Sequence, residues 1–255
     1  MEIYYLISFF LIGLLFGSFY NVVGYRLPRG ESIAYPPSHC TKCNHRLTPI
    51  ELIPIFSFLI QGGKCKNCKC KISWFYSVFE FITGVLFAVS YLVFGLSLDL
   101  LVAITFISML LIVIISDYQT MIIPDSLLIF SLILLIIELY FRDGLNLLLN
   151  HLLNAVIMFI IMFTIKKIGD FLFKRESMGG GDIKLMFIFG LVLGWPTSCL
   201  SICLSSFIGL PTSLILLNKN ETHEVPFGPF LAIAAIILII FKIDMNTIID
   251  IMTIK

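Results

Sequence analysis

Long runs of apolar residues make up most of the chain, and short polar or Gly/Pro segments separate them. A run of about 20 apolar residues can cross the ~30 Å hydrocarbon core of a membrane as a helix. Segment 25–73 is the exception, because it is polar and holds eight of the 17 basic residues. The pattern predicts about eight transmembrane helices, at residues 4–24, 74–94, 98–116, 125–141, 147–168, 183–195, 197–217 and 227–242.

The composition supports a membrane environment. Apolar residues make up 59% of the chain and charged residues 13%, about half the share in soluble domains, and the mean hydropathy is +1.02. These values exclude a disordered chain, a coiled coil and a soluble globular enzyme. We therefore expect an all-α polytopic membrane protein whose function depends on its few polar residues.

The uneven distribution of basic residues predicts the orientation. If eight helices alternate across the membrane, segment 25–73 and most of the other Lys and Arg residues lie on one face. The positive-inside rule makes that face cytoplasmic. The expected organisation is a first transmembrane helix at 1–24, a cytoplasmic loop domain at 25–73 and a membrane domain at 74–255.

Two cysteine pairs lie in the predicted cytoplasmic loop. Cys40 and Cys43 are separated by two residues, as are Cys65 and Cys68, and 21 residues separate the pairs. This spacing suits a tetrahedral Zn²⁺ site. A reducing cytoplasm disfavours disulfides, and four thiolates leave no open position for a substrate, so the expected role is to fold the loop. Free or redox-active cysteines are the alternative, and Cys70 can compete as a ligand.

Two aspartates lie at the predicted cytoplasmic ends of helices. Asp117 ends the third predicted helix, and Asp182 begins the sixth after three consecutive glycines. Glycine lets the backbone approach another chain closely, which can bring the two carboxyl groups together. A carboxyl pair that shares a proton can activate water to attack a peptide bond. The pair therefore indicates an aspartic protease, and the alternative is two helix caps in a transporter.

Two other acids are less informative. Asp125 follows Pro124 at a predicted helix start, so we expect it to cap that helix and orient the Asp117 loop rather than react. Glu80 lies about one turn into its predicted helix, where a structural and a functional role are equally well supported.

Several short segments resemble one known family. They occur in order around the cysteine loop and are similar to motifs of the type IV prepilin peptidase family, which belongs to the GxGD-type intramembrane aspartic proteases. The segments are residues 17–28, 51–54, 117–125, 179–184 and 226–230. After the second cysteine pair the family reads Ile-Ser-x-Arg-Tyr-Pro, whereas residues 72–77 here lack the Arg and the Pro.

The resemblance implies a bifunctional enzyme of the bacterial plasma membrane. Such an enzyme cleaves the basic leader from type IV prepilins or pseudopilins on the cytoplasmic side and methylates the new N-terminus from S-adenosylmethionine. The family's catalytic aspartates fall on Asp117 and Asp182, and Glu51 is the first candidate residue in the methyltransferase region. The zinc ligands of the family fall on Cys40, Cys43, Cys65 and Cys68.

Other functions remain open at this stage. A signal-peptide-peptidase-like protease with another membrane substrate would use the same two aspartates. A zinc-stapled transporter would use them as an ion relay. Nucleic-acid binding by the basic loop is not expected, because proximity to the membrane already explains its charge.

Overall fold

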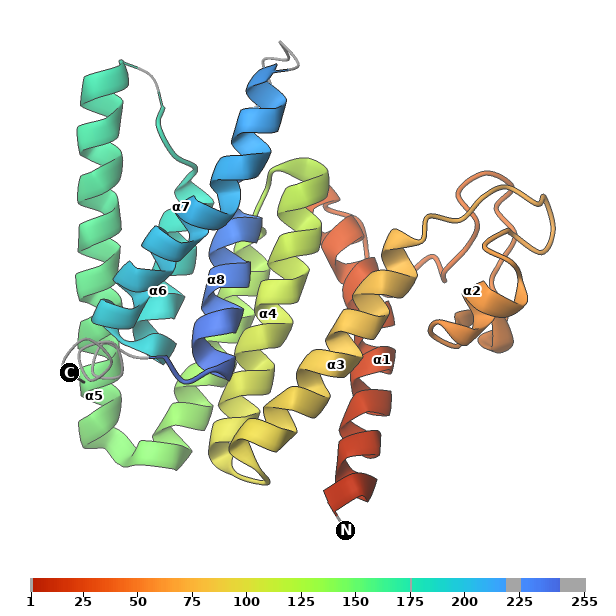
Figure 1. Ribbon diagram of the computed structural model, residues 1–255, viewed down its shortest axis with the longest axis horizontal. Helices are drawn as coiled ribbons and strands as arrows, with labels where there is room; N and C mark the ends of the chain where they lie inside the picture. Colours follow the sequence, from red (N-terminus) through yellow and green to blue (C-terminus); the bar gives the residue numbers. More distant parts are fainter. Residues whose placement is uncertain (1, 175, 219–225, 244–255) are drawn as a thin grey trace, which may run out of the picture. The chain divides into compact units, whose positions relative to one another are not determined.

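The computed structural model describes residues 2–174, 176–218 and 226–243, and these residues form helices and no β-strand. The chain divides into two compact units, Met1–Leu96 (unit 1) and Ser97–Lys255 (unit 2). Figure 1 shows the helices, which are α1 (Glu2–Arg26), η1 (Leu27–Arg29), η2 (Pro49–Leu52), α2 (Phe56–Ile60), α3 (Phe75–Phe94), α4 (Leu98–Thr120), α5 (Asp125–Phe173), α6 (Gly180–Leu193), α7 (Trp195–Asn218) and α8 (Gly228–Ile240).

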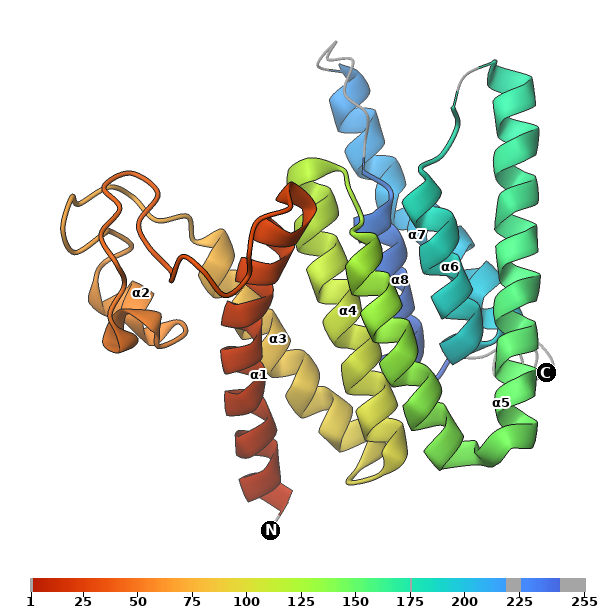
Figure 2. The ribbon, with the colours of Figure 1, turned by 180° about the vertical axis from the view of Figure 1, so that it is seen from behind.

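Unit 1 is built on the close packing of α1 against α3, which Figure 2 shows side by side. Gly13 and Gly17 are one helical turn apart on α1 and abut α3. A Cβ on Gly13 would lie 2.8 Å from Cα of Gly84, and one on Gly17 would lie 2.8 Å from Cα of Glu80. Small residues four apart permit such backbone contact between membrane helices, so the seam depends on these glycines.

The loop between α1 and α3 carries five of the seven cysteines. Arg26, the last residue of α1, donates from one guanidinium nitrogen to the carbonyl oxygens of Ser32 (3.1 Å) and Pro36 (2.7 Å), which fixes the start of the loop. Farther along, the backbone N–H of Ile55 donates to Oε2 of Glu80 on α3 (2.8 Å). The loop is therefore hydrogen-bonded to both helices of unit 1.

Unit 2 consists of α4 to α8. Helix α4 packs on α5 and α8, α6 packs on the second half of α5, and α7 packs on α8. The α5–α6 contact is close at Gly190, where a Cβ would lie 2.6 Å from the carbonyl oxygen of Asn154. Phe106 of α4 and Phe189 of α6 meet edge to face in the core, with ring centroids 5.5 Å apart.

Helix α5 bends at Gly144, whose φ of 75° is not helical, so it consists of two arms, 125–143 and 145–173. Ion pairs hold this bend: Arg142 contacts Asp99 (3.1 Å) and Asp143 (2.6 Å), and His151 contacts Asp143 (3.1 Å). Glycine tolerates the positive φ that such a bend requires.

The all-helical prediction is confirmed for the described residues. Four of their helices, α1, α3, α4 and α5, are long and apolar enough to cross a membrane. The predicted break between the sixth and seventh segments lies at Gly194, where α6 ends and α7 begins at Trp195. The protein is a multi-pass membrane protein, while the count of eight crossings and their orientation stay predictions.

Candidate functional site: a carboxyl pair, a cysteine cluster and a cavity

Asp117 lies in the last turn of α4 and is almost completely buried. Met121, with a φ of 53°, ends the helix, and its N–H donates to the carbonyl oxygen of Asp117 (2.9 Å). The backbone N–H of Gly228, at the start of α8, donates to the Asp117 carboxyl group. A Cβ on Gly228 would lie 2.6 Å from Oδ2 of Asp117, so only glycine fits there without moving the carboxyl group.

Asp182 lies in the first turn of α6 and is also buried. Gly179 is the N-cap of that helix, and its N–H donates to the Asp182 carboxyl group three residues later. This is the side-chain half of a capping box, which satisfies one of the unpaired N–H groups of the helix start. The helix start therefore fixes the Asp182 side chain.

The two aspartates belong to the same cluster of helix ends. Ile123 contacts the glycine beside each of them: a Cβ on Gly181, next to Asp182, would lie 3.0 Å from Cβ of Ile123, and one on Gly228, which hydrogen-bonds Asp117, would lie 3.3 Å from its Cδ1. The carboxyl groups of Asp117 and Asp182 interact electrostatically through space. The end of α4 and the starts of α6 and α8 thus converge, as Figure 1 also shows. The catalytic role of the pair stays a prediction.

Asp125 differs from its expected capping role. The N-cap of α5 is Pro124, and no side chain caps that helix. Instead, both carboxylate oxygens of Asp125 accept hydrogen bonds from Nζ of Lys184 on α6, at 2.6 and 2.8 Å. The ion pair joins the starts of α5 and α6 beside the two catalytic candidates.

The four predicted zinc ligands of unit 1 lie together. The sulfur atoms of Cys40, Cys43, Cys65 and Cys68 are all within 4.8 Å of one another. The Cys40–Cys68 and Cys43–Cys65 sulfur distances are 3.8 and 3.9 Å. A tetrahedral site with Zn–S bonds of about 2.3 Å requires sulfur separations of roughly 3.8 Å, so the cluster can hold a metal ion of this kind.

The two cysteine pairs have the same local fold. In each, the residue after the second cysteine has a positive φ, 54° at Asn44 and 57° at Lys69. The N–H of this residue donates to the carbonyl oxygen of the first cysteine, Cys40 (2.9 Å) or Cys65 (3.0 Å). The backbone N–H groups of Lys42 and Cys43 lower the pKa of Cys40 to about 6, which favours the thiolate that a metal binds.

Cys70 lies beside this cluster. Its sulfur is 3.6 Å from that of Cys40, so competition for a ligand position stays open. In the second turn Cys70 takes the place that His45 has in the first, since the N–H of Cys65 donates to Cys70 as that of Cys40 donates to His45. His45 itself contacts Glu51 at 3.4 Å and is not among the clustered ligands.

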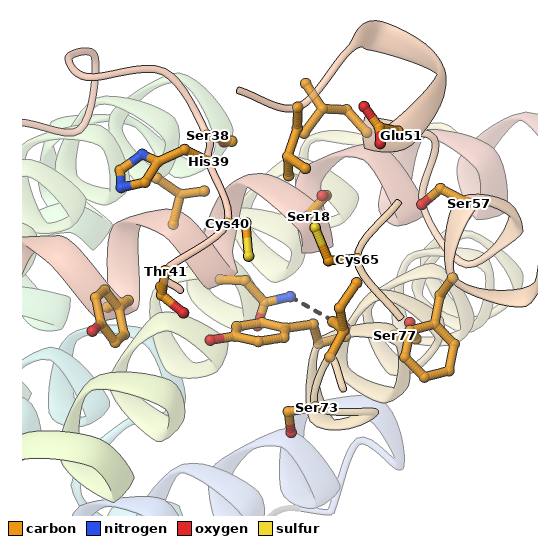
Figure 3. Close-up of a pocket in the computed structure, with 18 of the residues that line it drawn as sticks. Ser18, Ser38, His39, Cys40, Thr41, Glu51, Ser57, Cys65, Ser73 and Ser77 are labelled. Atoms are coloured by element: carbon orange, nitrogen blue, oxygen red, sulfur yellow. Dashed lines mark hydrogen bonds between the residues drawn. The ribbon is translucent and has the colours of Figure 1, made fainter. Parts of the chain in front are cut away.

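A cavity of about 670 Å³ lies between the cysteine loop and the ends of α1 and α3, all within unit 1. Figure 3 shows Glu51 at one side of it and the sulfur atoms of Cys40 and Cys65 toward its centre. Its size and its mixed polar and apolar lining suit a small-molecule or peptide side-chain site.

Glu51 is held rigidly in the wall of this cavity. Its Oε2 accepts hydrogen bonds from the backbone N–H (2.9 Å) and hydroxyl (2.8 Å) of Thr48, which lower its pKa. Its Oε1 is buried without a partner. A buried carboxylate oxygen without a hydrogen bond is costly, so a ligand that supplied a donor to this atom would stabilise it.

Sequence reasoning assigned no role to Gly228, Ile123 or Asn21. All three lie within segments that carried the resemblance, but their contacts join residues far apart in the chain. A polar Asn inside an apolar helix was a usable signal, because such residues usually mark a site or a helix contact.

Comparisons with known proteins agree with the motifs. The model of the bacterial Peptidase A24 N-terminal domain matches residues 11–94, and that of the type IV leader peptidase family matches residues 104–214. A prepilin leader peptidase/N-methyltransferase of Bacillus subtilis (strain 168) is 37% identical over 242 residues, which cover 91% of this chain and 92% of the relative. The chain belongs to the type IV leader peptidase family.

Two other relatives of the same name support this membership. The protein of Pseudomonas putida is 30% identical over 256 residues, covering 91% of this chain and 88% of its own. The protein of Aeromonas hydrophila is 31% identical over 261 residues, covering 91% and 89%. No solved structure matches this chain.

Proposed function

We propose that this protein is a membrane aspartic endopeptidase that removes the basic leader of type IV prepilins or pseudopilins and then N-methylates the new N-terminus. Its membership of the type IV leader peptidase family supports both activities, since relatives along about nine-tenths of the chain are prepilin leader peptidases/N-methyltransferases. The observation that carries the peptidase part is that Asp117 and Asp182 are both buried at helix ends of unit 2 and that their carboxyl groups interact electrostatically.

Asp117 and Asp182 are the proposed catalytic residues. One carboxylate takes a proton from a water molecule that attacks the peptide carbonyl, while the other, protonated, polarises the carbonyl oxygen. The proton then passes to the leaving amine, and no covalent intermediate with the enzyme forms. Gly228 and Gly179 support this scheme by hydrogen-bonding the two carboxyl groups from the backbone.

The cysteine cluster is proposed as a structural Zn²⁺ site with Cys40, Cys43, Cys65 and Cys68 as ligands. The sulfur distances support this proposal. A closed four-thiolate site supplies folding energy rather than a reactive position. The loop has only short helical turns of its own, so the metal would replace a hydrophobic core there.

The methyl donor is proposed to bind in the cavity of unit 1. Glu51 is the residue proposed to contact S-adenosylmethionine, because its partnerless Oε1 can accept from a hydroxyl or amino group of that molecule. S-Adenosylmethionine supplies an electrophilic methyl group. Glu51 would orient the donor and would not react.

The proposed location is the bacterial plasma membrane, with the cysteine loop and the two aspartates on the cytoplasmic side. The basic residues of segment 25–73 support this orientation through the positive-inside rule. The partners are then prepilin or pseudopilin precursors and the lipid bilayer, and no nucleic acid.

Mass spectrometry of a prepilin incubated with the purified enzyme in detergent tests both activities, because it detects leader removal and the added methyl group together. We expect Asp117→Asn and Asp182→Asn to abolish leader removal separately. We expect Glu51→Gln to retain leader removal and lose methylation. Wild-type rates in either aspartate variant would refute the peptidase assignment, and cleavage of other membrane peptides but not prepilins would favour a signal-peptide-peptidase-like enzyme.

A further inference from the structure

The interior of the unit 1 cavity differs in charge from the loop around it. Segment 25–73 is strongly basic, yet of its lysines and arginines only Arg26 and Lys71 line the cavity, beside His39. Arg26 already donates to two carbonyl oxygens of the loop. Three glutamates, Glu31, Glu51 and Glu80, line the same cavity, so its wall is acidic although the loop is basic.

Glu80 is the deepest of these acids. It is 8% exposed, and its Oε2 accepts the N–H of Ile55 at 2.8 Å. Ser18 also hydrogen-bonds its side chain. Among the ion pairs of the described residues, none includes Glu80. A buried carboxylate without a cation is unfavourable, so a cationic ligand would stabilise this part of the cavity.

Asn21 provides an independent indication of a ligand. It is 5% exposed, and its Nδ2 donates to the carbonyl oxygen of Tyr76 (3.2 Å), while its Oδ1 is buried without a partner. An amide oxygen of this kind lacks one hydrogen-bond donor. Asn21 also lines the cavity, so a ligand there can supply the donor.

The α1–α3 seam places Asn21 and Glu80 one helical turn apart. On one level of the seam, Gly17 of α1 contacts Glu80 of α3. One helical turn farther along, Asn21 of α1 donates a hydrogen bond to the carbonyl oxygen of Tyr76 of α3. Four residues of helix span about 6 Å along the axis. A single small group with several donors can therefore reach both side chains.

We propose that Asn21 and Glu80 form an ammonium subsite that binds a primary ammonium group of the peptide substrate. A primary ammonium has three N–H donors and a positive charge, which match the partnerless amide oxygen and the uncompensated carboxylate. The group comes either from a lysine side chain of the leader or from the α-amino end of a peptide. The choice of a peptide ligand rests on the proposed function.

The subsite also explains how a basic leader peptide can bind to a loop that is itself basic. The cationic side chains of the loop repel such a peptide, whereas the glutamates inside the cavity attract it. Opposite charges at short range in a partly desolvated cavity outweigh screened repulsion at the surface.

Isothermal titration in detergent tests this inference on the full-length protein carrying Asp182→Asn, which separates binding from cleavage. The four ligands are a lysine-containing prepilin leader peptide, its norleucine analogue, its N-acetylated form, and S-adenosylmethionine alone. Glu80→Gln and Asn21→Ala are compared with Glu2→Gln, an exposed acid outside the cavity. If Glu80→Gln does not fold, the comparison is made with Asn21→Ala instead.

We expect Glu80→Gln to raise the Kd of the lysine peptide tenfold or more, and Asn21→Ala to raise it about three- to tenfold, as for a lost charged or neutral hydrogen bond. Glu2→Gln should leave it within about twofold. If the norleucine peptide binds Glu80→Gln and its parent with the same Kd, the bound group is the lysine side chain. If the acetylated peptide binds both with the same Kd, the bound group is the α-ammonium group.

Two results would overturn the subsite. One is an equal loss of affinity for all three peptides, which would show that Glu80 acts only through its bond to Ile55. The other is a loss confined to S-adenosylmethionine. Cleavage by the wild-type enzyme, measured in parallel, keeps the two proposals apart, because absence of cleavage refutes the peptidase function whatever the binding data show.

Discussion

Gly228 offers the sharpest test of the carboxyl pair. In the structure its N–H donates to Asp117, and a Cβ at this position would lie 2.6 Å from Oδ2 of that residue. A Cβ essentially never comes closer than 3.0 Å to another heavy atom, and ordinary contacts begin at 3.4 Å, so Gly228→Ala must shift the carboxyl group or the backbone of α8 by about 0.4 to 0.8 Å. A displacement of about 1 Å can cost on the order of 100-fold in rate.

We therefore expect Gly228→Ala to lower kcat for prepilin cleavage by about 30- to 100-fold with a small change in KM. The matched control is Gly180→Ala, because a Cβ there has no heavy atom within 4 Å, and we expect it to retain activity within about twofold. Gly181→Ala should be intermediate, since its Cβ would lie 3.0 Å from Ile123.

The assay is a time course of leader removal by the detergent-purified variants, with thermal unfolding as a control for folding. Full activity in Gly228→Ala would refute the arrangement of Asp117 beside α8. Equal losses in Gly228→Ala and Gly180→Ala would also refute it, because the second substitution meets no neighbouring atom.

Three further predictions concern the rest of the chain. Cys65→Ser should remove the bound metal, measured by elemental analysis of the purified protein, whereas Cys203→Ser should retain it because Cys203 lies outside the cluster; equal metal contents would contradict the site. Lys184→Ala should lower the free energy of unfolding by no more than ~1 kcal/mol, since the Lys184 and Asp125 side chains are 51% and 61% exposed; a larger loss in denaturant titration would mean that the ion pair is worth more than an exposed pair. Gly17→Ala should destabilise the protein by about 1–3 kcal/mol in the same titration, because its Cβ would lie 2.8 Å from Cα of Glu80; an unchanged midpoint would show that α1 and α3 do not pack this closely.

The helices and the cysteine turns were largely predictable. Apolar runs specify helices in a membrane because each helix satisfies its own backbone hydrogen bonds. The bend of α5 at Gly144 and the end of α6 at Gly194 follow from glycine at a positive φ, a local property of the chain. The cysteine spacing likewise concerns residues close in sequence within each pair.

The expected capping role of Asp125 was wrong for a physical reason, while its role in orienting the Asp117 loop stays a prediction. Its position after Pro124 suggested a helix cap, but the carboxylate pairs with Lys184, which is 59 residues farther along the chain. The N-cap of α5 is Pro124 and Asp125 is the first helical residue, so the Asp125 carboxylate is one position too late to act as the N-cap side chain. The sequence contained both residues but not their proximity.

The sequence alone was enough to infer that the protein lies in a membrane and is helical. It was also enough to identify the zinc-type cysteine spacing, the two catalytic candidates and the family. Tertiary structure decided which residues are in contact: Gly228 lies against Asp117, and Ile123 contacts both Gly181 and Gly228. It also decided that Asn21 and Glu80 line the same cavity. The difference has one cause: helix formation and turn geometry depend on neighbours in the chain, whereas these contacts depend on the register and approach of helices that are far apart in sequence.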